Sequence, residues 1–178
     1  MNSLLPNREQ AIQLLRETNC PPQVISHCIA VANYALELAN RLQANDLSID
    51  LSLVEAGALL HDIGRSKTHG VDHSIAGAAI AQNLNLPPNL VNIIKRHVGA
   101  GISSEEAQQL GWPKDNYIPQ TLEEKIVCYA DKRIDNDKGV VPIEVEISRL
   151  QTAGFGAAAE RVRRLHIEIT NLIGETHD

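Results

Sequence analysis

The sequence predicts an all-α protein, and three observations support this prediction. The 178 residues are 43% hydrophobic but only 3% aromatic, so Leu, Ile, Val and Ala must form the core. Ala is common and the β-branched residues are scattered rather than alternating, which favours helices. No two alternating apolar runs are joined by the turn residues of a β-hairpin. We expect one helical bundle over residues 1–178, because this length suits one domain with a real core and not two.

Proline, cap residues and glycine mark the helices in the first half of the chain. Pro22 stands in the first turn of a long helix, where its missing N–H costs nothing. Asp50 or Ser52 is suited to cap the next helix, and Gly64 is suited to end it in the left-handed conformation. We expect helices over about residues 7–18, 22–44, 50–63, 73–84 and 88–98.

Capping patterns also predict the helices of the second half. Ser103 or Ser104 is suited to cap a short helix in SSEEAQQLG, and Thr121 with Glu124 forms a capping-box pattern. The stretch WPKDNYIPQ between them is a loop, because it is rich in proline and turn-forming residues. We expect the later helices over about residues 103–111, 121–135, 142–152 and 156–173, the last two within a C-terminal region of about 140–175.

Four polar side chains fall on helix faces that are otherwise apolar. His27 lies in the middle of an apolar stripe with the three- and four-residue spacing of a helix. His61 and Asp62 end the apolar run AGALLHD, and Asp131 shares its face with the apolar residues of IVCYADKRI. Burying such groups without partners costs free energy, so each of the four needs a partner inside the protein.

Each of these residues also has a purely structural explanation. A hydrogen bond within the core would account for His27, and contacts with the following loop would account for the His61–Asp62 pair. An ion pair with Lys132 or Arg133 would account for Asp131. Together, however, two imidazoles and two carboxylates from three helices suit one divalent cation with open coordination positions, such as manganese, iron, cobalt, nickel or zinc.

The ordered set of His27, His61-Asp62 in LLHDIG and Asp131 in YAD resembles the H…HD…D signature of the HD-domain metal-dependent phosphohydrolases. The resemblance covers about residues 21–135. Within the superfamily, the arrangement most resembles that of short stand-alone HDIG proteins. It implies a bundle of at least five helices with a metal site at its centre. It also implies that these four residues are the primary metal ligands.

The resemblance further implies a second ion in dinuclear members, where Asp62 would bridge both ions and two more histidines would join. The matching residues are His73 in DHSIAGA and His97 in KRHVG. We therefore expect one or two divalent ions, of manganese, iron, cobalt, nickel, zinc or magnesium. The chain departs from dinuclear relatives at Arg65, where they commonly have lysine, and at Val98, where some have another histidine. It has no GYP element, which argues against a cyclic dinucleotide phosphodiesterase of that type.

Basic residues accompany the candidate ligands, although the net charge of the chain is −6. We expect Arg65 and Lys67 to bind the phosphate of the substrate, and Asp62 and Arg65 to be catalytic. Arginine can hold phosphate with two hydrogen bonds but is a poor proton donor. The alternative is that helix ends simply favour basic residues. The basic neighbours of the candidate ligands are Arg65, Lys67, Lys95, Arg96, Lys132 and Arg133.

The expected function is a metal-dependent phosphohydrolase that attacks a small phosphoester, best matched by a nucleotide, with a metal-activated water. The alternative is a non-catalytic metal-containing module that binds a nucleotide or a partner protein. The negative net charge argues against stable binding of nucleic acid. A homo-oligomer is left open, since residues 140–178 either complete the bundle or form a dimer surface.

The compartment is expected to be the cytoplasm. The chain has no apolar run of the length of a membrane span, and its N-terminus lacks the apolar core of a secretory signal. Its three cysteines include no C-x-x-C pair, so neither a disulfide framework nor a zinc finger is expected.

Overall fold

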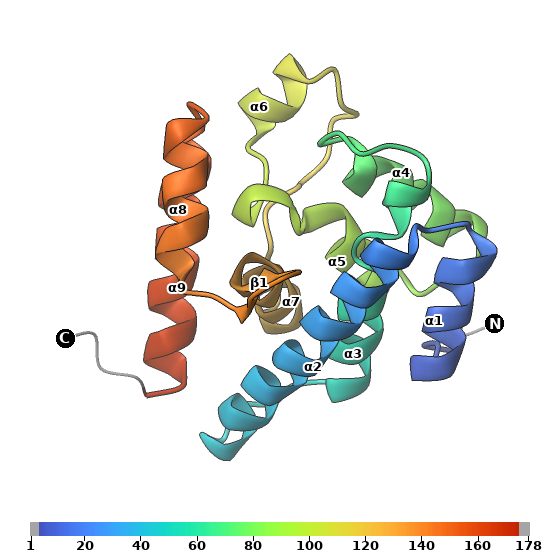
Figure 1. Cartoon of the computed structure of the whole chain (residues 1–178), viewed down its shortest axis with the longest axis horizontal. Coiled ribbons are helices and arrows are strands. Elements are labelled where there is room, and N and C mark those ends of the chain that lie inside the picture. The colour runs from blue at the N-terminus through green and yellow to red at the C-terminus, as the bar shows by residue number, and fades with distance from the viewer. Residues whose placement is uncertain (1–3, 175–178) are drawn as a thin grey trace.

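The computed structural model describes residues 4–174, and Figure 1 shows its helices. The helices α1 to α9 span Arg8–Glu17, Pro22–Ala44, Leu51–Leu60, His73–Asn83, Pro88–Arg96, Ser104–Gln109, Leu122–Arg133, Ile143–Thr152 and Gly156–Leu172. Two short 3-10 helices, η1 (Ile63–Ser66) and η2 (Val98–Ala100), follow α3 and α5. The all-α prediction is confirmed, and every expected helix is present near its predicted bounds. Within residues 4–174, no helix combines the length and apolar character needed to cross a membrane.

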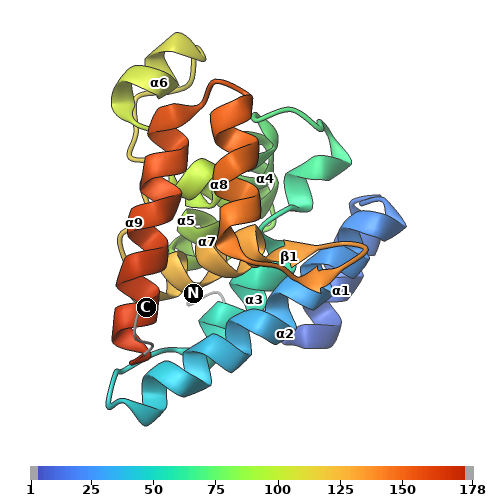
Figure 2. The same cartoon turned by 60° about the vertical axis from the view of Figure 1, so that its left-hand side comes forward.

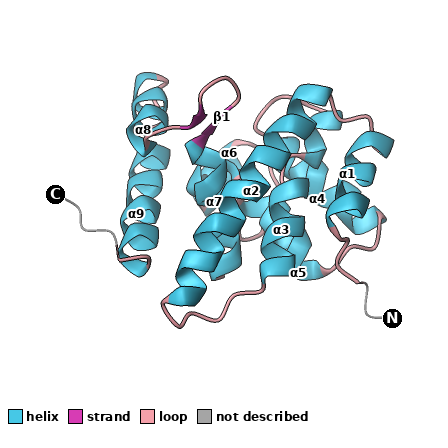
Figure 3. Ribbon diagram, turned by 60° about the horizontal axis from the view of Figure 1, so that its bottom comes forward, coloured by secondary structure: helices cyan, strands magenta, loops and turns pink. Residues whose placement is uncertain are grey.

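Four helices pack on one another at the centre of the molecule. Helix α2 contacts α3 and α7, while α5 contacts both α3 and α7. Helix α4 packs against α5 and η1, and α1 packs against α3. On the other side of α7, a hairpin of α8 and α9 packs against α7 and η2 (Figures 1 and 3). Figure 2 shows the two helices of this hairpin side by side.

Small residues let the central helices approach closely. A Cβ atom on Gly57 of α3 would lie 2.6 Å from Cδ1 of Ile93 in α5, and one on Gly77 of α4 would lie 2.8 Å from Cγ2 of Ile94. At such distances a larger residue would fit only if the isoleucine side chain or its helix shifted. Each of the two contacts lies about one helical turn from candidate ligands, which are His61, His73 and His97.

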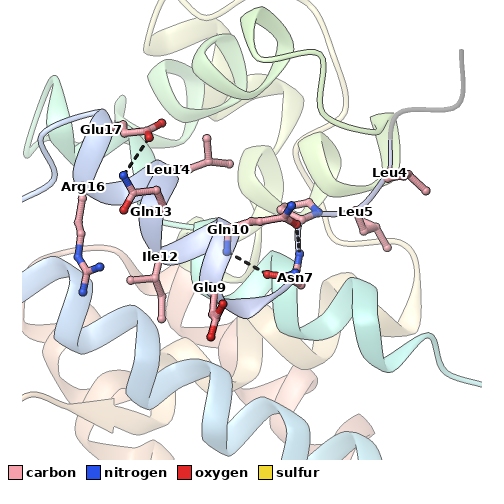
Figure 4. Close-up of a pocket in the computed structure, with 11 residues that line it drawn as sticks. Leu4, Leu5, Asn7, Glu9, Gln10, Ile12, Gln13, Leu14, Arg16 and Glu17 are labelled. Atoms are coloured by element: carbon pink, nitrogen blue, oxygen red, sulfur yellow. Dashed lines mark hydrogen bonds between the residues drawn. The ribbon is translucent and has the colours of Figure 1, made fainter.

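Side chains cap the N-termini of several helices. Asp50 and Ser103 each accept a hydrogen bond from the backbone N–H three residues further on, as predicted. At the start of α1, Asn7 and Gln10 form a reciprocal capping box, drawn in Figure 4. These local contacts fix where α1, α3 and α6 begin, and they are readable from the sequence because both partners are close neighbours in it.

Two residues have roles other than the predicted ones. Thr121 does cap α7, but the carboxylate of Glu124 does not complete a capping box; it accepts hydrogen bonds from the buried guanidinium of Arg96 at 2.8 and 3.0 Å. A buried carboxylate needs such a cation, and Oε2 of Glu124 also accepts a hydrogen bond from the backbone N–H of Gln120 at 2.7 Å. Gly64 is not a left-handed cap, since α3 ends before it. A Cβ there would lie 1.8 Å from the carbonyl oxygen of His73, so close packing against α4 requires glycine.

The sequence carries no hairpin signal, yet the structure contains one short hairpin. Two short antiparallel strands, β1 (Ile134–Asp135) and β2 (Gly139–Val140), follow α7. The turn is held by Oδ1 of Asp135, which accepts hydrogen bonds from the backbone N–H groups of Asp137 and Lys138. Strands of two residues are too short to show alternation, so hydrophobic periodicity could not reveal them.

Candidate metal centre

The centre lies where the C-terminal ends of α3 and α5 meet the start of α4 and one face each of α2 and α7. Four of its side chains lie at or next to helix ends and are buried, which are His61, Asp62, His73 and His97. The other two are His27, in the second turn of α2, and Asp131, in the last turn of α7. The structure brings together all six residues that the sequence predicted as metal ligands, which are His27, His61, Asp62, His73, His97 and Asp131.

A first group of ligand atoms joins α2, the end of α3 and α7. Oδ1 of Asp131 lies 2.9 Å from Nε2 of His27 and 3.4 Å from Nε2 of His61. Nε2 of His61 also lies 3.8 Å from Oδ2 of Asp62. The ligand atoms of His27, His61 and Asp131 all lie within 4.8 Å of one another, a spacing that could hold a metal ion.

A second group surrounds the other oxygen of Asp62. Oδ1 of Asp62 lies 3.0 Å from Nε2 of His73 and 3.4 Å from Nε2 of His97. The ligand atoms of His61, Asp62 and His97 likewise lie within 4.8 Å of one another. Asp62 therefore stands between two groups of ligand atoms and presents one oxygen to each.

Hydrogen bonds to the backbone fix the orientation of three imidazoles. Nδ1 of His61, His73 and His97 lies 2.7, 2.7 and 2.8 Å from the carbonyl oxygen three residues earlier. A carbonyl oxygen only accepts hydrogen bonds, so each Nδ1 carries a proton and each neutral ring presents the lone pair of Nε2. Three Nε2 atoms and the Asp62 carboxylate thus converge on one region, as at sites where the outer hydrogen bond of a histidine orients it for a metal.

Burial and neighbouring charges shift the pKa values of several groups at the centre. Burial opposes ionisation of Asp62, but His61, His73 and His97 outweigh it and hold the pKa of this carboxyl far below its usual range. Burial also disfavours protonated His61, yet the charge of Asp62 outweighs burial and raises the pKa of His61 well above 6.5. Burial lowers the pKa of His97 to about 4, so this ring is neutral near pH 7 and is free to bind a metal.

Two buried atoms at the centre have no hydrogen-bond partner within residues 4–174. They are Nε2 of His61 and Oδ1 of Asp62, which belong to the first and second groups of ligand atoms. Buried polar atoms are normally satisfied, so two such atoms at one centre indicate a missing ligand. Nitrogen and oxygen donors of this kind fit a divalent ion such as manganese, iron or zinc.

The structure brings only part of the predicted basic residues to the centre. Arg65 donates from Nε to Oδ2 of Asp62 at 2.7 Å, and Lys132 pairs with Oδ2 of Asp131. Asp131 thus has the ion pair that was the structural alternative, together with its contacts to two histidines. Lys67 is exposed and does not line the cleft beside the centre. Lys67 is close to the His61–Asp62 pair in sequence, but side chains that are neighbours in sequence point in different directions.

The other basic neighbours have structural partners. Lys95 pairs with Asp115 on the surface, and Arg96 pairs with the buried Glu124. The guanidinium of Arg133 donates to the hydroxyl oxygen of Tyr129 at 2.7 Å. None of the three lines the cleft, so the count of basic residues near the motif overstated the positive charge at the centre.

A cleft of about 590 Å³ opens beside the centre, and its far wall was not predicted. At one end it is lined by Arg65, His73, His97, Asp131 and Lys132. At the other end it is lined by residues of α6, α8, α9 and the α8–α9 turn, including Leu110, Arg149, Phe155 and Arg161. The sequence feature that belongs to this wall is Gly154-Phe155-Gly156, a pattern that by itself indicates an ordinary turn. A separate hollow along α1, shown in Figure 4, contains none of the candidate ligands.

Comparisons with known proteins agree with this geometry. A model of the HD domain matches residues 24–134. The chain is 40% identical over 171 residues to an uncharacterized protein of Methanocaldococcus jannaschii, covering 93% of this chain and 98% of that protein. It is 38% identical over 174 residues to a tRNA (cytidine(56)-2'-O)-methyltransferase of Picrophilus torridus, covering 98% of this chain but 49% of the relative. The chain thus spans about half the length of that methyltransferase.

A solved structure shares the fold. The HD domain of the phosphodiesterase PgpH of L. monocytogenes, in complex with cyclic-di-AMP, superposes with a TM-score of 0.57 at 18% sequence identity. The superposition covers 93% of this chain and 99% of that domain. The match of the family model over more than half of the sequence, and a relative of nearly the same extent, establish that the chain belongs to the HD-domain family.

Proposed function

We propose that this protein is a metal-dependent phosphohydrolase whose substrate is a small phosphoester, best matched by a nucleotide. The observation that carries the proposal is the convergence of four histidine Nε2 atoms and two carboxylates beside one open cleft. A purely structural metal site has no need of a cleft, since such sites are usually closed by four protein ligands and rich in sulfur.

The residues present would hold either one or two ions. His27, His61, Asp62 and Asp131 would hold the first, and Asp62, His73 and His97 would contribute to a second. Manganese, iron, cobalt, nickel, zinc and magnesium are the candidates. When bound, the ion supplies Lewis-acid stabilisation of the phosphate and an acidified water at neutral pH.

The chain's own cations orient this centre. Arg65 and Lys132 each hold one oxygen of a ligand carboxylate, which leaves the other oxygen of Asp62 and of Asp131 turned toward the histidines. Both cations also line the cleft, where they would stabilise negative charge on a bound phosphate. Arg65 is therefore proposed both to position Asp62 and to bind substrate, while Lys132 takes the place that the sequence suggested for Lys67.

Three considerations support a nucleotide. The cleft volume is within the range of ordinary small-molecule sites. The domain of PgpH with a similar fold was solved with a dinucleotide, and the Picrophilus torridus relative is named for a tRNA modification. A nucleotide or an RNA end would present the same chemistry, which is a phosphate beside a ribose and a base. We propose that the chain acts as a single HD domain in the cytoplasm, and a non-catalytic nucleotide-binding module is the alternative.

Metal analysis and a substrate panel test the proposal. The purified protein would be loaded in turn with manganese, iron, cobalt, nickel, zinc and magnesium. It would then be assayed against nucleoside mono-, di- and triphosphates, cyclic dinucleotides, a short RNA and p-nitrophenyl phosphate. We expect phosphate or nucleotide release that depends on the metal and is abolished by a chelator. Asp62→Ala and Asp131→Asn should lose at least about 100-fold of the activity, because each removes a charged group from the centre.

Asp115→Asn is the matched control, since it also removes a carboxylate paired with a basic residue but lies outside the cleft. It should retain the wild-type rate. If all metals and substrates give no turnover while the protein binds both metal and nucleotide, the binding-module alternative replaces the enzyme.

A further inference from the structure

The cleft beside the metal centre has two chemically different ends. Its inner end carries His73, His97 and Asp131 together with Arg65 and Lys132. Its outer end is formed mainly by apolar side chains, which are Val98, Ile102, Leu110, Leu150, Phe155 and Ala158. A ligand that fills both ends must carry an anionic group at one end and a flat or apolar group at the other.

The outer end does not attract a second phosphate. Its two arginines are already neutralised, because Arg149 pairs with Glu146 at 2.7 Å and Arg161 pairs with Glu106 at 2.9 Å. The Nε atom of Arg161 is buried and has no hydrogen-bond partner within residues 4–174. The outer wall therefore offers apolar side chains beside ion-paired arginines, which suits a neutral heterocycle better than it suits an anion.

Phe155 is the aromatic residue of this wall, and it is the single phenylalanine of the chain. It lies in the turn between α8 and α9, visible at the end of the hairpin in Figure 2, and is 61% exposed. Its backbone is nevertheless fixed, since its N–H donates to the carbonyl of Leu150 at 2.8 Å and its carbonyl accepts from Ala159 at 3.0 Å. A Cβ atom added at Gly154 or Gly156 would meet nothing within 4 Å. A large, mostly exposed apolar ring thus lines the cleft on a fixed backbone.

We propose that Phe155 stacks on the base of the bound nucleotide and so selects nucleotides over base-free phosphoesters. The inference rests on the proposed function for the phosphate end, but the base subsite is a distinct property of the α8–α9 hairpin. With the phosphate at the inner end, the base lies at the outer end against Phe155. The C-terminal hairpin is therefore the part of the protein that recognises the substrate.

Equilibrium binding tests this proposal without relying on turnover. Isothermal titration calorimetry would compare AMP and ribose 5-phosphate on the manganese-loaded wild type and on Phe155→Ala, Phe155→Trp and Val145→Ala. A base–aromatic stack corresponds to an affinity change of about 5- to 100-fold. We expect AMP to bind the wild type at least about 5-fold more tightly than ribose 5-phosphate, and Phe155→Ala to remove that difference.

The two other variants are controls for the stacking contact. Phe155→Trp should keep the preference for AMP, because it keeps an aromatic face. Val145→Ala removes an apolar side chain that is 52% exposed on α8 but does not line the cleft, so it should change neither affinity. Equal loss of AMP and ribose 5-phosphate binding in Phe155→Ala would overturn the proposal, and so would unchanged AMP binding in that variant. Absence of hydrolysis with the selective binding intact would refute the enzyme but not the base subsite.

Discussion

His73 and His97 come from different helices, yet their Nε2 atoms lie 2.9 Å apart and both face Oδ1 of Asp62. Each ring is protonated on Nδ1 by its bond to a backbone carbonyl, so two lone pairs would face each other if both rings are neutral. A shared cation removes this repulsion. The close approach of His73 and His97 therefore favours a second ion at the centre.

We predict that the wild type binds about two divalent ions per chain and that the double variant His73→Ala/His97→Ala binds about one. The first group of ligand atoms, around His61 and Asp131, does not include the two substituted residues. Inductively coupled plasma mass spectrometry after gel filtration measures the ratio. His166→Ala is a matched control, because His166 is hydrogen-bonded to Tyr129 and lies outside the centre. A wild type with a single ion that the double variant retains would return both histidines to substrate binding or packing.

Gly64→Ala should destabilise the protein and disturb the second group of ligand atoms. The added Cβ would lie 1.8 Å from the carbonyl oxygen of His73, so the start of α4 must move away from η1. Overpacking of this kind costs about 1–3 kcal/mol or more. Thermal unfolding should show a melting temperature several degrees lower, and metal analysis should show less bound ion. Gly70→Ala is the control, since its nearest new contact is 3.7 Å, and an equal effect of both substitutions would contradict the packing argument.

The three thiols should be unreactive in the folded protein. Cys20, Cys28 and Cys128 are all buried, and burial raises the pKa of each, that of Cys128 to about 11. Because the thiolate is the reacting form, alkylation near pH 8 should be slow. Mass spectrometry after timed treatment with iodoacetamide should find mostly unmodified protein, and three adducts once guanidinium has unfolded it. Rapid labelling of the native protein would show that the core opens easily at these sites.

Glu106 should make stability depend on pH in the acidic range. Burial raises the pKa of this carboxyl, but hydrogen bonds from the backbone of Ser103 and from Arg161 outweigh burial and lower the pKa below 4.5. A depressed pKa stabilises the folded state above the unfolded-state pKa, and this contribution is lost as pH falls through the folded-state pKa. Glu106→Gln keeps the capping pattern but removes the charge. It should therefore be less stable than the wild type near about pH 6, by less than about 1 kcal/mol because the pair is partly exposed.

The difference between wild type and Glu106→Gln should then shrink as the pH falls below 4.5 and the wild-type carboxyl becomes protonated. Urea unfolding at several pH values measures it. A difference that stays constant over this range would show that the carboxylate contributes through shape alone.

The sequence by itself determined the helices and the first four candidate ligands. Helical periodicity and caps depend on residues a few positions apart, so the apolar stripe around His27 and the cap at Asp50 were already legible in the chain. A polar residue on an apolar stripe, such as Asp131, is buried by any packing of that stripe and therefore needs a partner inside the protein. The resemblance to HD domains then placed His73 and His97 at the same centre.

Only the tertiary structure decided which of the other side chains reach that centre. Lys67 and Lys132 both follow a ligand closely in sequence, but only Lys132 lines the cleft, because the direction of a side chain depends on the local backbone. The partner of Arg96 is the buried Glu124, which lies 28 residues further along the chain, so no local pattern indicated this ion pair. The wall that carries Phe155 arises from a hairpin that the chain packs against η2 and α7. Contacts between distant segments depend on how whole helices pack, and a local pattern does not contain that information.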